Sequence, residues 1–355
     1  MSNTNLNKAK REKNDEFYTQ LRDIETEMNA YLEYDPNVFR DKTILLPCDD
    51  PTWSNFTKYF AEQFETLGLK KLISTSYAAD GGHGKVFVLD GENELQWEYL
   101  TGDGDFRSAE VTALRDEADI VITNPPFSLF REFMVWLTEG DVLFSVIGNK
   151  NAITCKGIFP LIKDNKMRVG NRSMSDSFLF ILPKYSQDET LEGKPGSRYR
   201  VVDGEIMGSA PAMWFTNIQH GRRHEPLKLT TQTDNETSNN RISKNPNSYK
   251  SYDNYDAIEV PSTSGIPSDY TGVMGVPISF LDKYCPEQFE IIGTTESEGV
   301  GLSRGLHDGS DVKQATVENK KLYKRIFIRH IKPTVQLAQV HMLKTATPAP
   351  QQMAA

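Results

Sequence analysis

The run Asn124-Pro125-Pro126-Phe127 is the part of the sequence best suited to chemistry. Two successive prolines fix two φ angles and remove two backbone donors, so the run predicts a stiff loop with outward carbonyl groups. With the Asn124 amide, such carbonyls can accept both hydrogens of a planar amino group and direct its nitrogen lone pair toward an electrophile. Phe127 can then stack on a flat base. The run fits equally well a plain strand-to-helix turn, with Phe127 in the core.

A second set of chemically suited residues lies in segment 194–228, where positive charge collects between aromatic side chains. Lysine and arginine can neutralise phosphates, and arginine can also read guanine edges. An aromatic side chain could fill the place of a base that has left the helix. A solvated basic face is the alternative interpretation. The residues concerned are Lys194, Arg198, Arg200, Arg222, Arg223 and Lys228, interleaved with Tyr199, Trp214 and Phe215.

The Asn-Pro-Pro-Phe run lies in a part of the chain where strand and helix patterns alternate, and these elements must position it. A helix is expected to begin after Ser54 and to stop at Gly68, and another is expected after Ser108. Short apolar runs between the helical stretches predict strands, and the alternation predicts an α/β fold with an open, mainly parallel sheet. In such sheets ligands bind beyond the carboxyl ends of the strands. The expected strands are 43–47, 71–76, 85–89, 95–100, 119–123 and 142–147.

Composition bounds the protein class. The 355 residues have a net charge of -9, with 38% hydrophobic and 25% charged residues, as in a soluble globular protein rather than a disordered one. Apolar runs fall short of the roughly 20 residues that span a bilayer, and the N-terminus lacks the apolar stretch of a signal peptide. Three distant cysteines predict a reducing cytoplasm, and the scattered histidines predict no metal site.

Charge is unevenly distributed along the chain. Residues 1–150 carry 15 Lys and Arg against 27 Asp and Glu, whereas residues 151–355 carry 25 against 22. Such asymmetry between halves indicates separate roles. A net charge of -9 disfavours a protein that simply coats nucleic acid, but it is compatible with one that grips nucleic acid through a local basic face.

Eight segments in this order resemble the EcoRI-type adenine-specific DNA methyltransferases. The resemblance covers most of the chain and includes the Asn-Pro-Pro-Phe run, which is a form of the amino-methyltransferase signature. The segments are NDEFYTQ (14–20), LLPCDDPTWSNFTKYF (45–60), GLKKLISTSY (68–77), GDGDFRS (102–108), DEADIVITNPPFSLFREF (116–133), MWFTNIQHGRRHEPL (213–227), AIEVP (257–261) and MGVPISFLDKYCPEQFEIIG (274–293).

The resemblance implies a Rossmann-like fold that uses S-adenosylmethionine. Carboxylates after the first strand could hold the cofactor's ammonium or ribose hydroxyls, and an Asp-Phe pair before a helix could bind and cover its adenine ring. The usual Gly-rich loop is absent, and no acid follows the second strand, where Ser74, Ser76 and Tyr77 stand. The implied cofactor-binding residues are Phe17, Tyr18, Thr19, Asp49, Asp50, Asp105 and Phe106.

The family's reaction is methylation of the exocyclic amino group of adenine in duplex DNA, which requires the base to flip out of the stack. The resemblance assigns the catalytic roles to Asn124, Pro125, Pro126 and Phe127. No covalent nucleophile is required, so Cys48 and Cys155 are interpreted as packing residues. The implied DNA-binding residues are Arg198, Arg200, Trp214, Arg222 and Arg223.

The predicted organisation places a loop-rich DNA-recognition region after a catalytic core. The last apolar stretch, 322–331, alternates basic and apolar residues, as a half-buried edge strand would. Double-stranded DNA is the expected partner, without a membrane, and a companion restriction endonuclease acting on the same site is left open, as is the oligomeric state. The expected units are a flexible N-terminus (1–14), the methyltransferase core (15–165), the recognition region (166–260), a C-terminal part that packs on the core (261–335) and a tail (336–355).

Two other interpretations stay open on the sequence. The first is a methyltransferase that acts on RNA or on a protein glutamine, because loops of this kind also serve amide nitrogens. The second is a DNA-binding protein without catalysis on a decayed methyltransferase fold. The complete Asn124–Phe127 run argues against decay.

Overall fold

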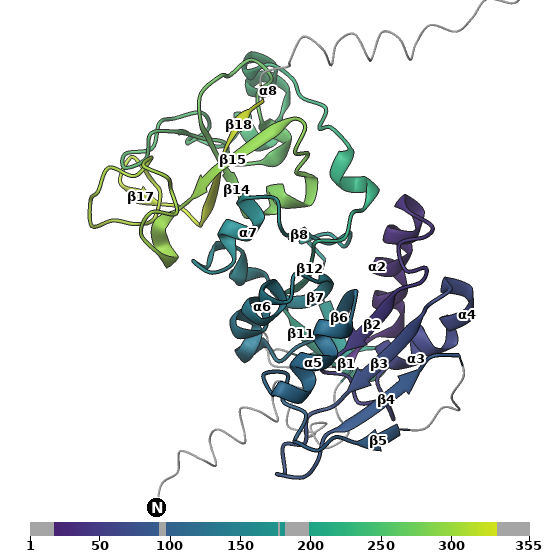
Figure 1. Ribbon diagram of the computed structural model, residues 1–355. Coiled ribbons are helices and arrows are strands. Elements are labelled where there is room, and N and C mark those ends of the chain that lie inside the picture. Colours follow the sequence, from purple (N-terminus) through teal and green to yellow (C-terminus); the bar gives the residue numbers. More distant parts are fainter. Residues whose placement is uncertain (1–17, 92–96, 177, 182–198, 332–355) are drawn as a thin grey trace, which may run out of the picture.

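An eight-stranded mixed sheet forms the centre of the computed structural model, which describes residues 18–91, 97–176, 178–181 and 199–331 (Figure 1). Its strand order is β5-β4-β3-β2-β6-β7-β12-β8. The bounds are β2 (Thr43–Leu46), β3 (Lys71–Thr75), β4 (Lys85–Leu89), β5 (Trp97–Tyr99), β6 (Ile120–Thr123), β7 (Leu143–Asn149), β8 (Arg168–Val169) and β12 (Ala212–Thr216).

The prediction of a mainly parallel sheet is confirmed only for the centre. The pairs β2–β3, β2–β6 and β6–β7 are parallel, whereas β4, β5, β8 and β12 join in antiparallel pairs. The central strands are short apolar runs buried along most of their length, as expected for strands covered on both faces. The outer pairings depend on contacts between distant segments, which a local pattern does not encode.

Helices cover the sheet where the sequence predicts them. Ser54 caps α3 (Asn55–Glu62) by accepting a hydrogen bond from Phe56 N, and Ser108 caps α5 (Ala109–Glu117) by accepting one from Val111 N. Gly68, at φ 63°, ends α4 (Phe64–Leu67) in the left-handed conformation that favours glycine. These local signals fix helix ends without reference to the rest of the chain. The remaining helices of the core are α2 (Leu21–Tyr34), α6 (Phe130–Glu139) and α7 (Phe159–Lys163), with 3-10 turns at η1 (Phe127–Leu129) and η2 (Lys150–Thr154).

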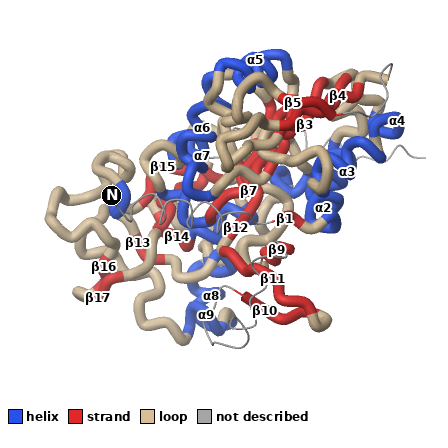
Figure 2. Tube along the Cα trace, turned by 90° about the horizontal axis from the view of Figure 1, so that it is seen from below, coloured by secondary structure: helices blue, strands red, loops and turns tan. Residues whose placement is uncertain are grey.

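A small antiparallel sheet joins the start of the described chain to its middle (Figure 2). Its order is β1 (Tyr18–Thr19), β9 (Phe178–Ile181), β11 (Glu205–Ala210) and β10 (Tyr199–Val202). The region predicted to be loop-rich therefore contributes strands to this sheet, and it also contributes β8 and β12 to the central one.

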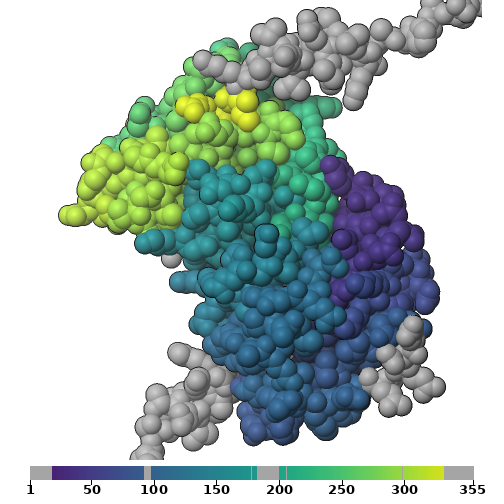
Figure 3. Space-filling model, viewed as in Figure 1, coloured from purple at the N-terminus to yellow at the C-terminus, as the bar shows by residue number. Residues whose placement is uncertain are grey.

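The C-terminal unit, residues 230–331, is built on a four-stranded sheet with the order β13-β14-β18-β15. Its strands are β13 (Ile258–Glu259), β14 (Met274–Pro277), β15 (Phe289–Thr294) and β18 (Arg325–His330), beside the hairpin of β16 (Thr316–Val317) and β17 (Lys320–Lys321). Its helical turns are α8 (Gln232–Ser238), α9 (Asn240–Ser243), η6 (Thr263–Gly265), η7 (Ile278–Lys283) and η8 (Glu296–Glu298). Figure 3 shows this unit, green to yellow, on one end of the core, with a hollowed flank below it.

The prediction that the last strand lies at an edge is wrong, because β18 pairs with both β14 and β15. Arg325 is consequently buried rather than an edge charge, and it forms a two-point ion pair with Glu259 (Nη2 to Oε1 2.8 Å, Nε to Oε2 2.9 Å). The Tyr252 hydroxyl donates to the same carboxylate. Arg329 is exposed and pairs with Glu290. A buried arginine on an apolar strand resembles an exposed one in sequence, because only its partner distinguishes them.

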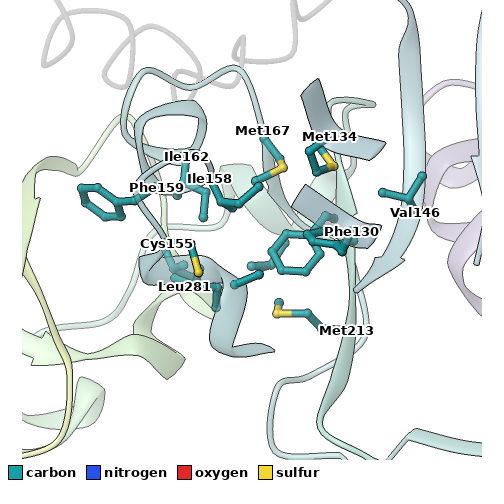
Figure 4. Packing of buried hydrophobic residues seen from close by; sticks show 14 of the residues in the cluster. Phe130, Met134, Val146, Cys155, Ile158, Phe159, Ile162, Met167, Met213 and Leu281 are labelled. Carbon is teal, nitrogen blue, oxygen red and sulfur yellow. The ribbon is translucent and has the colours of Figure 1, made fainter. Parts of the chain in front are cut away.

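One hydrophobic cluster runs from the central sheet into the C-terminal unit. Figure 4 shows Phe130 and Met134 of α6 packed with Val146, and the neighbouring layer of Ile158, Cys155 and Leu281. Leu281 belongs to η7, so the two units share buried side chains. The predicted division at residue 165 stays a prediction. Across the described ranges, no helix is long and apolar enough to cross a membrane.

Candidate active site

The Asn-Pro-Pro-Phe run lies at the carboxyl end of β6, in the middle of the central sheet. Strand β2 has β3 on one side and β6 on the other. The chain adds strands on the β3 side first and then crosses to the β6 side, so the strand order reverses between β2 and β6. Ligands in open α/β sheets bind at such a reversal. Pro125 is buried, and Asn124, Pro126 and Phe127 are half-buried. The run thus has the position expected for a binding loop and also begins the turn η1, as its alternative interpretation predicts.

Phe127 faces the small sheet. Its ring centroid lies 6.2 Å from that of Phe180 in β9, at an interplanar angle of 75°. Because Phe180 belongs to β9, this contact brings the small sheet next to the Asn-Pro-Pro-Phe loop.

Asp49 links the ends of two parallel strands. It follows β2, is 5% exposed, and accepts hydrogen bonds from Ser54 Oγ (2.7 Å) and from Thr123 Oγ1 (2.6 Å). Thr123 is the last residue of β6 and directly precedes Asn124. The carboxylate of Asp49, which was predicted to bind the cofactor, therefore accepts hydrogen bonds from hydroxyl groups of the protein. In this arrangement Asp49 is a positioning residue that fixes the start of the Asn-Pro-Pro-Phe loop relative to β2.

Burial raises the pKa of Asp49 to about 7, although the hydrogen bonds from Thr123 and Ser54 oppose the shift. In the unfolded chain the same carboxyl titrates near 3.8. The stability associated with this group is thus fully present below the unfolded pKa and is lost as the pH rises through the folded pKa. We therefore expect the difference in the free energy of unfolding, wild type minus Asp49→Asn, to decrease as the pH rises. The expected slope is about 1.4 kcal/mol per pH unit between roughly pH 4 and pH 7.

Urea unfolding at a series of pH values measures this difference. The variant Asp119→Asn, altered at the residue before the same strand β6, is the control for the loss of one carboxylate near this strand. If Asp49→Asn and the wild type instead show parallel pH curves, Asp49 does not titrate in this range.

Asp50 occupies the turn after Asp49 and is half-buried. Its carboxylate accepts from Lys85 Nζ at 2.8 Å and from Thr52 N at 2.8 Å. Although burial opposes the shift, hydrogen bonds from Lys85 and Thr52 hold the pKa of Asp50 below its usual range, so it is ionised at neutral pH. An ionised, partly accessible carboxylate suits a cationic or hydroxyl-bearing ligand.

Ser74, within β3, and Ser76, directly after it, form hydrogen bonds within the protein. Ser74 Oγ donates to the Asp49 carbonyl at 2.5 Å and lies 2.7 Å from Thr57 Oγ1, and Ser76 Oγ accepts from Lys85 N at 3.2 Å. These contacts hold the end of β3 against the turn after β2. These hydrogen bonds do not identify which residue contacts the ribose of the cofactor.

Two glycines bring the loop of Asp105 against the end of β3. A Cβ on Gly104 would lie 2.1 Å from the Ser76 carbonyl oxygen, and one on Gly84 would lie 2.5 Å from the same atom. Gly104 also has a φ of 81°, which favours glycine. Sequence analysis missed both positions, although the repeated Gly-Asp of segment 102–105 is a signal for a tight loop.

Asp105 is half-buried at this loop, and Arg107 binds its carboxylate through Nε (2.9 Å) and Nη2 (2.6 Å). These hydrogen bonds hold the pKa of Asp105 below its usual range. Phe106, in contrast, is 4% exposed and packs against Phe133 and Trp136, with ring centroids 4.9 Å and 5.6 Å away. The predicted stacking of Phe106 on a cofactor ring is corrected to a core position, because α6 places its aromatic partners Phe133 and Trp136 against it.

Tyr18 and Thr19 lie over the start of α3. Asn55 Nδ2 donates to the Thr19 carbonyl at 2.8 Å, and the Tyr18 ring centroid lies 4.0 Å from that of Trp53. The segment predicted to cover the cofactor thus sits beside the turn of Asp50. Phe17, predicted with them, lies outside the described residues.

The predicted DNA-binding residues separate into accessible and buried ones. Arg200 is exposed on β10, and Arg222 is half-buried, with Nη1 donating to the Asn171 carbonyl. Arg223 is 4% exposed with its guanidinium 5.6 Å from the Tyr284 ring centroid, and Trp214 is 1% exposed in β12. DNA contact by Trp214 or Arg223 is therefore incompatible with this arrangement, and Arg198 lies outside the described residues.

The burial of Trp214 has a simple cause. The run Ala212–Thr216 forms a strand between β7 and β8 and is buried at every position, so its aromatic side chains pack in the core. In the sequence these aromatic residues were grouped with the neighbouring charged residues, and strand β12 was not predicted.

Similarity to known proteins spans nearly the whole chain. The family model described as "Adenine-specific methyltransferase EcoRI" matches residues 5–331. The Type II methyltransferase M.EcoRI of Escherichia coli is 40% identical over 348 residues, covering 93% of this chain and 97% of that protein. The Type II methyltransferase M.MpnI of Mycoplasma pneumoniae (strain ATCC 29342 / M129 / Subtype 1) is 35% identical over 332 residues, covering 91% and 97%. No solved structure matches the chain.

Proposed function

Because this chain belongs to the EcoRI-type adenine-specific methyltransferase family, we propose that it transfers a methyl group from S-adenosylmethionine to the N6 atom of an adenine in duplex DNA. The observation that carries this proposal is the place of the Asn-Pro-Pro-Phe loop, at the reversal of strand order and beside the carboxylates that follow β2.

The arrangement of β3, β2, β6 and β7 supports a Rossmann-like methyltransferase fold. These four strands are parallel and neighbours in the sheet, and the chain crosses from one side of β2 to the other before it reaches β6. Doubly wound sheets of this kind create a crevice between the two central strands.

The residues at this crevice fit S-adenosylmethionine. The ionised carboxylates of Asp50 and Asp105 could accept hydrogen bonds from its ammonium, hydroxyl or amine groups, and Tyr18 and Thr19 would cover it. The close backbone approach at Gly104 holds the loop of Asp105 against the end of β3, next to the crevice. When bound, the cofactor supplies an electrophilic methyl group.

The protein's part in the reaction is positioning and electrostatic stabilisation. The target adenine leaves the duplex stack, which costs a few kcal/mol. Asn124 Oδ1 and the Pro125 carbonyl accept the two hydrogens of its amino group, and Phe127 stacks on the base. Both acceptors favour the build-up of positive charge on the attacking nitrogen. Asp49 acts through Thr123, by holding the loop in place.

Accessible basic residues outside this loop would contact the DNA. Arg200 lies on the hairpin of β10 and β11, in the small sheet that lies next to the Asn-Pro-Pro-Phe loop, and Arg222 is partly accessible. Positive side chains of this kind neutralise phosphates.

Transfer of a labelled methyl group tests the function directly. We expect label from S-adenosylmethionine to appear as N6-methyladenine in duplex DNA. Structured RNA and a glutamine-containing peptide, offered under the same conditions, should remain unlabelled. Label in either of these substrates and none in DNA would overturn the proposal.

The cofactor site is tested by two matched amide substitutions. We expect Asp50→Asn and Asp105→Asn each to weaken S-adenosylmethionine binding by roughly 10–100-fold, because each removes a charged hydrogen-bond acceptor. Isothermal titration calorimetry measures the affinities. Asp119→Asn, at the opposite end of β6, is the control and should bind as the wild type does. Wild-type affinity in both test variants would place the cofactor elsewhere.

A further inference from the structure

Three buried nitrogen atoms gather around one small cavity where the central sheet meets the C-terminal unit. The cavity is lined by Arg168 of β8, by His220 and Arg223 at η5 (Gly221–His224), and by Leu281, Asp282 and Tyr284 from the other side. Arg168 Nε, His220 Nδ1 and Arg223 Nη2 are buried and have no hydrogen-bond partner among the described residues. The three side chains are 7%, 4% and 4% exposed, so solvent does not supply the missing partners freely.

The two arginines at this cavity have no carboxylate in direct contact among the described residues, and Glu287 acts on Arg223 only through its charge at longer range. Arg168 Nη1 donates to the Asn217 carbonyl at 3.0 Å, and Arg223 lies over the Tyr284 ring, but neither arginine forms a salt bridge with a described residue. Burial, and secondarily the charge of Arg223, lowers the pKa of Arg168 to about 10. Asp282 lines the cavity, but its carboxylate accepts from Ser173 Oγ (2.9 Å) and Met174 N (2.8 Å). Two guanidinium groups buried in this way are costly unless a negative charge joins them.

We propose that this cavity binds one small monovalent anion of about the size of chloride, held by Arg168 and Arg223. The cavity volume is about 20 Å³, which is enough for a water molecule or an ion of similar size. A water molecule would satisfy the orphaned nitrogens but would leave the two guanidinium groups without a direct counter-ion. A phosphate of a DNA backbone does not fit, because the three nitrogens are shielded from solvent.

His220 reports on the bound anion. Its Nε2 donates to the Val169 carbonyl at 3.1 Å, and burial lowers its pKa to about 4, helped by the charges of Arg168, Arg223 and Arg222. The ring is therefore neutral at pH 7, with a lone pair on Nδ1. An anion beside Nδ1 favours the protonated ring, whose Nδ1–H then donates to it, so anion binding raises the pKa of His220. The other titratable groups that face it are Asp282 and Tyr284 across the cavity and Tyr31, whose ring centroid is 6.3 Å away.

Bromide provides a direct probe, because it has the chemistry of chloride and a strong anomalous signal. Crystals of the full-length wild-type protein in sodium bromide should show an anomalous peak between the Arg168 and Arg223 side chains. Density for water at this place, with no anomalous signal at high bromide concentration, would overturn the proposal.

Thermal unfolding measures the same event in solution. At constant sodium concentration, replacing gluconate, which is too large for the cavity, by chloride should raise the melting temperature of the wild type by about 2 °C when chloride is in roughly tenfold excess over its Kd. The shift should vanish in Arg223→Met and persist in Arg329→Met, which removes an exposed arginine from the C-terminal unit.

The outcomes separate a bound ion from a general salt effect. Equal chloride shifts in the wild type, Arg223→Met and Arg329→Met would show that chloride acts at other sites and would refute the proposal. If Arg223→Met fails to fold, the pKa of His220 in the wild type decides, measured by NMR in gluconate and in chloride. A rise in chloride supports the proposal, and an unchanged pKa contradicts it.

Discussion

Replacing Asn124 by alanine is expected to slow methyl transfer by roughly 100–1,000-fold, because the side chain accepts a hydrogen bond that strengthens as charge develops on the attacking nitrogen. The backbone of the loop is held independently, by the two prolines and by the link from Asp49 to Thr123. Binding of S-adenosylmethionine and of duplex DNA should therefore stay within about threefold of the wild type. Single-turnover transfer and equilibrium binding together measure the two effects.

The control for this substitution is Asn37→Ala. Asn37 is exposed and far from the loop, where its side chain accepts a hydrogen bond from Arg40. It should transfer methyl groups at the wild-type rate. Near-normal turnover in Asn124→Ala would show that the Asn-Pro-Pro-Phe run is only a structural turn here, and loss of both binding affinities would indicate a folding defect instead.

The second large effect concerns the ion pair inside the C-terminal unit. Arg325→Met leaves Glu259 buried at 1% exposure without its cation, and we expect the free energy of unfolding to fall by about 3–5 kcal/mol. The double variant Glu259→Leu with Arg325→Met should recover most of this loss, because no buried charge remains. Urea unfolding of the full chain measures both variants.

Arg329→Met is the matched control, since it removes an arginine from the exposed end of the same strand. Its pair with Glu290 is half-exposed on both sides, and such pairs contribute at most about 1 kcal/mol. A loss in Arg325→Met no larger than that of Arg329→Met would mean that solvent reaches Glu259.

Sequence alone predicted the features that depend on neighbouring residues. The caps at Ser54 and Ser108, the stop at Gly68 and the strand that ends at Thr123 are all confirmed, because each is set by a few adjacent side chains. The position of Asn124 at a strand end follows from the same local pattern. Family resemblance added the adenine-specific methyltransferase assignment, which similarity over nearly the whole chain supports.

Features that depend on distant pairing were not predictable from the pattern. The burial of Trp214 and Arg325 follows from the insertion of β12 between β7 and β8 and of β18 between β14 and β15. The Asp49 side chain points into the protein because it accepts a hydrogen bond from the Thr123 hydroxyl. Phe106 is buried because it packs against Phe133. Trp214, Asp49 and Phe106 were assigned to a ligand and Arg325 to an exposed strand edge, although in all four the protein itself supplies the partner.

The order of strands has a consequence for synthesis on the ribosome. Strand β7 is made well before β12, which covers its edge, and β1 is made long before its partner β9. A nascent chain that includes β7 but not yet β12 thus presents an open strand edge, a common starting point for aggregation. We expect chaperones to engage the chain during this interval. The lateral edge of β7 is covered only after residue 216 has left the exit tunnel, long after the Asn-Pro-Pro-Phe loop has been made.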